Sequence, residues 1–239
     1  MDLDGARYLS RETQIVDQIN LPLVLNAKMS LDNFIGEANQ QLLTLIHQTL
    51  QEQAPALIYV AGAQGFGKTH LLQGSAFAAM EQSLNVAYID LADETPCELI
   101  QELYQQDWIV IDNLDLASDD QQQATFDLYN RIKDTQATLI VSAQTTPGEL
   151  NILKDLKTRL ALGLVFNLEA LSDREKMQIL QNKMLDKNLR IDTKVLDYLL
   201  KHFSRNLTQL WALIEQLDSL SLQQKKPITI PFVKQVLTD

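Results

Sequence analysis

The residues with the most specific chemistry form a glycine-rich loop that ends in a lysine and a threonine. Residues 62–69 read Gly-Ala-Gln-Gly-Phe-Gly-Lys-Thr, a GxxxxGK[ST] pattern in which glycines let backbone N–H groups surround a phosphate. Lys68 can reach the β- and γ-phosphates of a nucleotide, and Thr69 can ligand Mg²⁺. An apolar run of strand length, residues 57–60, precedes the loop, and helical spacing follows it. The sequence therefore predicts phosphate binding by Gly62, Gly65, Gly67, Lys68 and Thr69.

Polar residues also follow two later apolar runs. The run at residues 108–111 leads into Asp112, and an acid at that place beside a phosphate loop holds the Mg²⁺ shell. The run at residues 139–141 leads towards Gln144. We expect Gln144 to approach the γ-phosphate or an attacking water, although a polar start to a loop is an equally good interpretation.

Asn113 bears on whether such a site hydrolyses ATP. Many ATPases place Glu or Asp next to the metal-binding acid to activate water, and an amide cannot accept a proton in that role. Asp115 is near enough in the sequence to substitute. We expect weak intrinsic hydrolysis.

The segments that must position these residues alternate between strand and helix. Helical spacing covers about 37–52 and recurs between the apolar runs. Continuous apolar runs are typical of strands in a parallel sheet covered on both faces, so the alternation predicts an α/β fold. The runs of strand length are residues 57–60, 86–89, 108–111, 139–141 and 164–166.

From Leu171 onward the pattern is purely helical. Ser172 and Glu175 form a capping-box sequence, and periodic runs follow at about 193–203 and 206–222. Pro231 suits the first turn of a last helix. The outline is a five-stranded α/β domain followed by a small helical domain. Within the first of these, we interpret residues 121–123, three glutamines, as the polar face of a helix.

Composition and charge exclude several classes of protein. The 239 residues carry a net charge of −11, which disfavours direct binding to nucleic-acid backbones. Residues 1–150 have a net charge of −15 and residues 151–239 of +4, a hint of a domain boundary. The single Cys97 excludes an intramolecular disulfide, and a structural zinc site is excluded because no Cys/His ligand spacing occurs. No apolar run approaches the roughly 18 residues of a membrane helix, and the start lacks a signal-peptide layout, so we expect a cytoplasmic protein.

These features together resemble the AAA+ ATPases. The shared features are the phosphate loop, an Asp-ended third strand, a polar tip on the fourth strand, an Arg before the fifth and a helical lid. Residues 31–36, with Asn39, and residues 126–131 resemble the DnaA branch of replication initiators. Within that branch, the likeness to the regulatory inactivators of the Hda family extends from Gln18 to residues 228–234.

The resemblance implies a P-loop core with a five-stranded parallel sheet of order 5-1-4-3-2 and a small α-helical lid domain. ADP or ATP, with Mg²⁺, would bind between core and lid. Thr69 and Asp112 would hold the metal, and Arg159 would be an arginine finger offered in trans, whereas an Arg at this place is otherwise usually a surface salt bridge. The implied nucleotide-binding residues are Gly62, Gly65, Phe66, Gly67, Lys68, Thr69, His70, Asp112, Gln144, Phe34 and Ile35.

One position departs from the AAA+ pattern. Lids of this superfamily commonly present an Arg to the phosphates, and that place falls on Thr208, which carries no charge. Arg205, three residues upstream, is the alternative cation. Loss of a charge contact at the γ-phosphate predicts ADP as the resident ligand.

The first residues are predicted to form an extended leader, residues 1–33, ahead of a core at 34–170 and a lid at 171–239. Residues 18–23, Gln-Ile-Asn-Leu-Pro-Leu, are similar to the peptide by which Hda proteins bind the DNA polymerase III sliding clamp (the beta subunit). Gln18 would supply a polar anchor. An apolar plug suits a groove on a partner, and Pro22 restricts the conformations of the unbound peptide. The plug consists of Leu21, Pro22 and Leu23.

The function implied by the resemblance is negative regulation of bacterial DNA replication initiation. The protein would dock on the clamp and stimulate hydrolysis of ATP bound to DnaA through Arg159. Sequence-specific DNA binding is not expected, because the chain ends within about ten residues of Ile230 and carries no basic stripe. Homo-oligomerisation is left open. Two alternatives are an ATPase motor or helicase loader, which Asn113 and Thr208 disfavour, and a nucleotide-locked clamp adaptor without a hydrolytic role.

Overall fold

The computed structural model describes residues 29–203 and 206–238. Residues 18–23, the predicted clamp-binding peptide with Gln18, Leu21, Pro22 and Leu23, lie outside the described residues, as does Arg205. Among the described residues, no helix is both long and apolar enough to cross a bilayer.

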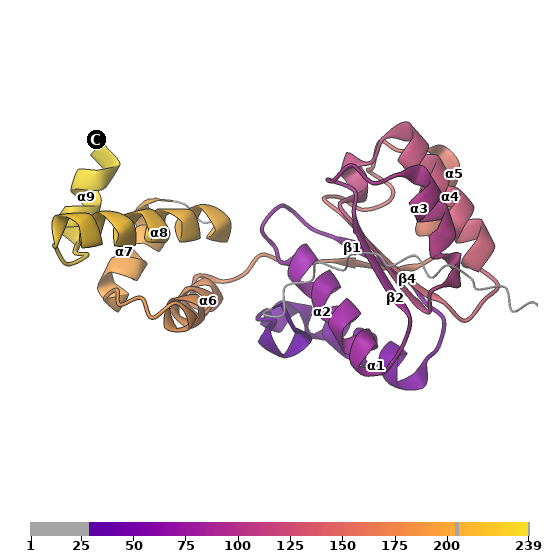
Figure 1. The fold of residues 1–239 in the computed structure, drawn as a ribbon, viewed down its shortest axis with the longest axis horizontal. Coiled ribbons are helices and arrows are strands. Elements are labelled where there is room, and N and C mark those ends of the chain that lie inside the picture. Colours follow the sequence, from indigo (N-terminus) through magenta and orange to yellow (C-terminus); the bar gives the residue numbers. More distant parts are fainter. Residues whose placement is uncertain (1–28, 204–205, 239) are drawn as a thin grey trace, which may run out of the picture.

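A five-stranded, fully parallel sheet forms the centre of the larger part of the molecule (Figure 1). Its strand order is β2-β3-β4-β1-β5, which confirms the predicted order 5-1-4-3-2. Each predicted apolar run is a strand, extended by one to three residues. The strands are β1 (Leu57–Ala61), β2 (Val86–Asp90), β3 (Trp108–Asp112), β4 (Thr138–Ala143) and β5 (Leu164–Asn167).

Helices cover both faces of the sheet because side chains along β1 to β4 alternate between two apolar clusters. Ile58 and Val60 of β1 join the cluster formed with α1 (Gln40–Glu52) and α2 (Lys68–Glu81). Tyr59 and Ala61 join the opposite cluster. The helices of that face are α3 (Cys97–Glu102), α4 (Asp119–Ile132) and α5 (Lys154–Leu160).

Short 3₁₀ turns connect several elements: η1 (Leu31–Asn33), η2 (Glu37–Asn39), η3 (Leu103–Gln105) and η4 (Leu114–Leu116). The first of them departs from the extended conformation expected up to residue 33. Leu31 is buried, and its backbone N would lie 2.9 Å from a Cβ placed on Gly74 of α2. A glycine in the helix therefore lets this segment approach closely, and burial of Leu31 stabilises the turn.

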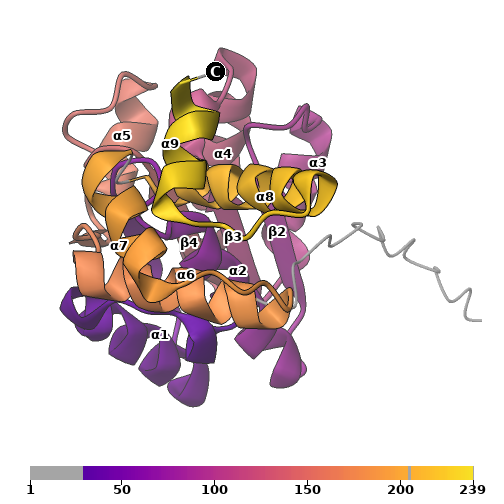
Figure 2. The same cartoon turned by 90° about the vertical axis from the view of Figure 1, so that its left-hand side faces the viewer.

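The C-terminal helices form a separate unit with its own apolar cluster, connected to the sheet by a single segment (Figure 1). Seen from the lid side in Figure 2, these helices lie in front of the sheet. The predicted capping box starts the unit: Ser172 Oγ accepts from the N–H of Glu175, and Glu175 accepts from the N–H of Ser172. The helices are α6 (Asp173–Asp186), α7 (Thr193–His202), α8 (Leu207–Gln224) and α9 (Ile230–Thr238), with Pro231 in the first turn of α9.

Candidate nucleotide site

The glycine-rich loop runs from the end of β1 to the start of α2, at the carboxyl edge of the sheet. Gly65 and Gly67 have φ values of +83° and +97°, which favour glycine because a side chain clashes with the backbone there. A Cβ on Gly67 would also lie 3.1 Å from the ring of Phe34. The sequence thus provides a tight loop that opens directly onto the N-terminus of a 14-residue helix, an arrangement suited to anions.

Lys68 lies inside this loop with only 7% of its surface exposed. Its Nζ donates to the carbonyl oxygen of Gly62 at 2.6 Å and to that of Ala63 at 3.3 Å. Burial lowers the pKa of Lys68, while the charges of Asp112 and Asp115 oppose that shift. The ammonium therefore stands near both carboxylates, at the place where a phosphate would add negative charge.

Asp112 ends β3 and is fully buried. Its Oδ1 accepts from Ser142 Oγ and, at 3.0 Å, from the N–H of Asn113. Its Oδ2 accepts from the hydroxyl of Tyr88 at 2.9 Å. Burial, followed by the charge of Asp112, raises the pKa of Tyr88, so that hydroxyl keeps its proton and donates.

Asp112 and Thr69 offer a carboxylate and a hydroxyl, the oxygen ligands that Mg²⁺ prefers when phosphate and water complete its shell. Within residues 29–203 and 206–238, no group of three or more His, Cys, Asp or Glu side chains forms a metal site by itself. These two side chains therefore fit a metal that arrives with a nucleotide better than one held by protein alone.

The residues beside Asp112 are joined in two pairs. Asn113 has a left-handed backbone, φ 57°, and its side-chain amide donates to Asp90 Oδ1 at 2.7 Å. Gln144, just after β4, donates to Asp115 through its side-chain amide at 2.8 Å and its backbone N–H at 3.1 Å. Asp115, the carboxylate that could act as a catalytic base in place of Asn113, thus already accepts hydrogen bonds from two N–H groups of Gln144.

A cleft of about 730 Å³ lies between the phosphate loop and the lid, within the size range of small-molecule sites. The core contributes a wall from the segment before α1 and from the loop. The lid contributes residues of α6 and the start of α8. The lining residues from the core are Met29, Asn33, Phe34, Ile35, Gln64, Gly65, Phe66, Gly67, Lys68, Thr69, His70 and Asn113; those from the lid are Leu171, Ile179, Asn182, Lys183, Leu185, Asp186, Leu207 and Thr208.

Phe34 and His70 form an aromatic corner of the cleft, with ring centroids 5.5 Å apart and an interplanar angle of 84°. The Nε2 of His70 lies 2.9 Å from the carbonyl oxygen of Ser30. Burial lowers the pKa of His70, and the nearby Lys183 lowers it further, although the bond to Ser30 opposes both effects. A neutral imidazole beside a phenyl ring suits a flat, uncharged heterocycle.

One hydrogen bond connects the lid to the core around this cleft, and the start of α8 lies close to the phosphate loop. Glu175 Oε1 of α6 accepts from the N–H of Glu37 at 2.8 Å. The side chain of Asn206, which caps α8, would lie 3.5 Å from a Cβ on Gly65. The start of α8 therefore faces the phosphate loop, and Thr208 lines the cleft at the place where an arginine is expected.

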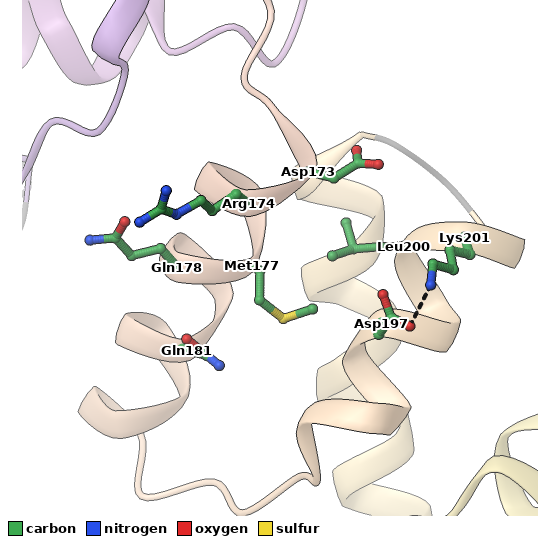
Figure 3. A pocket seen from close by; sticks show the side chains of 8 residues that line it. All are labelled: Asp173, Arg174, Met177, Gln178, Gln181, Asp197, Leu200 and Lys201. Carbon is green, nitrogen blue, oxygen red and sulfur yellow. Dashed lines mark hydrogen bonds and ion pairs between the residues drawn. The ribbon is translucent and has the colours of Figure 1, made fainter.

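The opposite side of α6 borders a second cleft, of about 480 Å³, between α6 and α7 (Figure 3). Met177 and Leu200 point into it, and Lys201 pairs with Asp197 at 2.7 Å on its rim. None of its lining residues also lines the cleft beside the phosphate loop. Helix α6 therefore presents one side to the core and another to α7.

Arg159 lies on α5, whose Leu156 and Leu160 are buried against the sheet. It is half-buried and does not line the cleft. Its guanidinium has no hydrogen bond or ion pair to any residue that the structure describes. Of the predicted site residues, the loop residues from Gly65 to Thr69 line the cleft together with Phe34, Ile35 and His70. The predicted residues that do not line it are Gly62, Asp112, Gln144 and Arg159.

Comparison with known proteins identifies the family. The family model described as the bacterial DnaA ATPase domain matches residues 25–167. The chain belongs to the DnaA-related AAA+ family. In this DnaA-related protein, the model described as the Hda lid domain matches residues 173–237. The family is replication-related.

Individual proteins are similar to this chain in sequence or in fold. An uncharacterized protein of Haemophilus influenzae is 30% identical over 226 residues, which covers 92% of this DnaA-related chain and 98% of the relative. Domain III of the Thermotoga maritima initiator DnaA has the same fold, with a TM-score of 0.77, 20% identity, and coverage of 90% and 98%. AMPPCP-bound DnaA from Aquifex aeolicus gives a TM-score of 0.68, 24% identity, and coverage of 82% and 66%.

Sequence reasoning missed several residues of the site in this DnaA-related protein. Tyr88 and Ser142 hold Asp112 but belong to no motif, and only a parallel register with β3 would have placed them there. The lid wall had a weak signal: Ile179, Asn182, Lys183 and Asp186 recur at three- and four-residue spacing on α6, the period of one helix face.

Proposed function

We propose that the cleft binds an adenine nucleotide with Mg²⁺. The observation that carries the proposal is the position of the GxxxxGK[ST] loop, which forms one wall of a cleft closed on its other side by the lid. Lys68 and the N-terminus of α2 would bind the phosphates, and Phe34, Ile35 and His70 would contact the base. Bound AMPPCP in the DnaA of Aquifex aeolicus supports this assignment.

Thr69 and Asp112 would hold the metal, which when bound neutralises charge on the phosphates. Because Thr208 brings no charge to the γ-phosphate, ADP is the proposed resident nucleotide. Weak intrinsic hydrolysis is also proposed, since Asn113 cannot act as a base and the Asp115 carboxylate is bound by Gln144.

The proposed biological role is negative regulation of replication initiation. Residues 18–23 would dock the protein on the DNA sliding clamp, the core (34–170) and lid (171–239) would hold nucleotide, and Arg159 would act on ATP bound to DnaA. Arginine fingers of this kind accelerate phosphoryl transfer by about 10³–10⁵-fold. Support comes from the match to the Hda lid domain and from an Arg159 guanidinium that has no partner among the described residues.

The decisive experiment measures hydrolysis of ATP prebound to DnaA, with this protein added, with and without clamp loaded on DNA. The test variant is Arg159→Ala, and Lys154→Ala is a matched control because it removes another cation from α5. We expect stimulation that requires the clamp, is lost in Arg159→Ala and survives in Lys154→Ala. Clamp-dependent stimulation that persists in Arg159→Ala would refute the finger.

A second arm tests the leader. Leu21→Ala with Leu23→Ala should abolish capture by the clamp, because the apolar plug is removed, while nucleotide binding by the core is retained. Unchanged clamp binding would refute this part of the proposal. If DnaA-bound ATP is untouched while the protein hydrolyses ATP rapidly itself, the motor or loader alternative replaces it. If the protein tethers DnaA to the clamp without hydrolysis, it is an adaptor.

A further inference from the structure

A row of hydrogen-bonded side chains crosses the sheet beneath the phosphate loop. It starts at Gln73 of α2, which bonds to the Tyr88 hydroxyl on β2. The Tyr88 hydroxyl donates to Asp112 Oδ2 at 2.9 Å. Ser142 of β4 donates to the other carboxylate oxygen. The row therefore joins the phosphate-loop helix to three neighbouring strands.

The row fixes the orientation of the Asp112 carboxylate. A carboxylate with one oxygen held cannot rotate freely, and Asp112 has a donor on each oxygen from opposite neighbouring strands. Tyr88 donates to Oδ2, whereas Ser142 and the N–H of Asn113 donate to Oδ1. Removal of the Tyr88 hydroxyl takes a donor from one oxygen of a fully buried acid.

The row also reaches the helix that carries Thr69, the other side chain that fits a metal. Gln73 follows Thr69 by four residues on α2, so the two lie on the same face of the helix, one turn apart. A hydroxyl that accepts from Gln73 and donates to Asp112 uses both of its hydrogen-bonding functions. The Tyr88 side chain is therefore the link between α2 and the Asp112 carboxylate in this row.

We propose that Tyr88 is a positioning residue for Mg²⁺: its hydroxyl orients Asp112 and, through Gln73, keeps the acid in register with Thr69. Tyr88 touches neither nucleotide nor metal in this arrangement and acts through Asp112. The inference rests on the proposed nucleotide site. Partners of metal ligands elsewhere change metal affinity by about 10–100-fold when removed.

The test is a Mg²⁺ titration of nucleotide binding in the full-length Tyr88→Phe variant, with the fluorescent ADP analogue mant-ADP as the probe. The Kd for mant-ADP in EDTA should stay within about twofold of the unmodified protein, because the phosphate loop is intact. The Mg²⁺ concentration that gives half of the metal-dependent tightening should rise about tenfold or more. If Tyr88 had a purely structural role, mant-ADP would instead bind more weakly both in EDTA and in Mg²⁺.

Thr138→Val is the matched control. Thr138 is buried at the opposite end of the sheet, and its hydroxyl donates to the carbonyl of Ala54 at 3.2 Å, so this variant also removes one hydrogen-bonding hydroxyl. Its Mg²⁺ dependence should match the unmodified protein. The inference is overturned if Tyr88→Phe keeps the original Mg²⁺ dependence or if Thr138→Val loses it equally.

Gln73→Met decides the matter if Tyr88→Phe does not fold. It keeps the length of the side chain but removes the amide, and it should shift the Mg²⁺ midpoint in the same direction by a smaller factor. No shift in a folded Gln73→Met protein would overturn the inference. Failure of the Tyr88 inference can be distinguished from failure of the proposed nucleotide site. If the unmodified protein binds mant-ADP without any Mg²⁺ dependence, only the role of Tyr88 is overturned. If it binds no nucleotide, the proposed site is overturned as well.

Discussion

Replacement of Glu175 by Ala should loosen the lid from the core. Glu175 makes two kinds of contact in the structure. Its Oε2 accepts from the N–H and the hydroxyl of Ser172, both at 2.6 Å, which caps α6. Its Oε1 accepts from the N–H of Glu37 at 2.8 Å, across the connection between the sheet and the lid.

The size of the effect follows from these contacts. Loss of a capping interaction costs about 1 kcal/mol. A hydrogen bond to a charged group is worth about 1.5–3 kcal/mol, and we discount it to about 1 kcal/mol because Glu175 is partly exposed to solvent and is screened. The equilibrium for opening of the lid contact should therefore shift by roughly fivefold for the Glu37 bond alone.

The amide proton of Glu37 reports this opening directly, because its acceptor belongs to the lid. NMR measurement of its exchange with water should show a rate at least about five times higher in Glu175→Ala, because the substitution removes the acceptor and about 1 kcal/mol of protection with it. Glu149→Ala is the matched control: Glu149 accepts from the N–H and hydroxyl of Thr146 within the core and has no hydrogen bond or ion pair to the described residues of the lid. Equal Glu37 exchange rates in the unmodified protein and Glu175→Ala would refute the reasoning.

Acid should act in the same direction as this substitution. The hydrogen bond from the Ser172 hydroxyl, followed by those from the N–H groups of Glu37 and Ser172, lowers the pKa of Glu175 below its ordinary value of 4.5. The stabilisation is therefore complete above about pH 4.5 and is lost as the pH falls through the lower pKa of the folded protein. After correction for intrinsic exchange, the exchange rate of the Glu37 amide should rise as the pH falls below about 4.5 in the unmodified protein. The same rate in Glu175→Ala should not change with pH in that range.

Three further changes have defined outcomes. Gly67→Ala should destabilise the fold by about 1–2 kcal/mol and weaken nucleotide binding, because φ is +97° and the new Cβ meets Phe34 at 3.1 Å; urea unfolding and a nucleotide titration measure both. The unfolding free energy should fall as the pH drops below 6.5, since the pKa of His70 is lowered by burial and the unfolded chain binds the proton first; His70→Gln should flatten that slope in urea titrations at several pH values. Thr208→Arg should tighten ATP relative to ADP, because it adds a cation to the lid wall of the cleft, and competition binding with both nucleotides checks it.

Much of the fold was predictable because its signals are local. Each strand is a short apolar run, and the capping box at Ser172 marks the start of α6 within one residue. The interpretation of residues 121–123 as a polar helix face was wrong for Gln121 and Gln122, which are buried. Gln122 binds the carbonyl of Ala117 and the N–H of Leu153. Burial of the Gln122 amide depends on a backbone partner as distant as Leu153, and the periodicity of the sequence cannot reveal such a partner.

The candidate site was predictable to the extent that a motif covers it. The phosphate loop and the carboxylate of Asp112 follow from spacing and from the apolar run that precedes each. The partners of Asp112 do not, because Tyr88 looks like an ordinary strand aromatic until β2 is aligned with β3. The lid wall was missed for a different reason: its residues share only a helical period, and which side of α6 meets the core depends on the connection after β5.

The position of β1 between β4 and β5 has a consequence for synthesis on the ribosome. Leu57 pairs with Leu139, and Ile58 pairs with Leu164, so β1 has no partner strand until much of the core has been translated. At about 5–20 residues per second, the wait for β4 lasts on the order of 4–16 s. During that time an apolar strand and the glycine-rich loop after it remain exposed to nascent-chain binding factors. The sheet therefore cannot be completed until the last residues of β5 have left the exit tunnel.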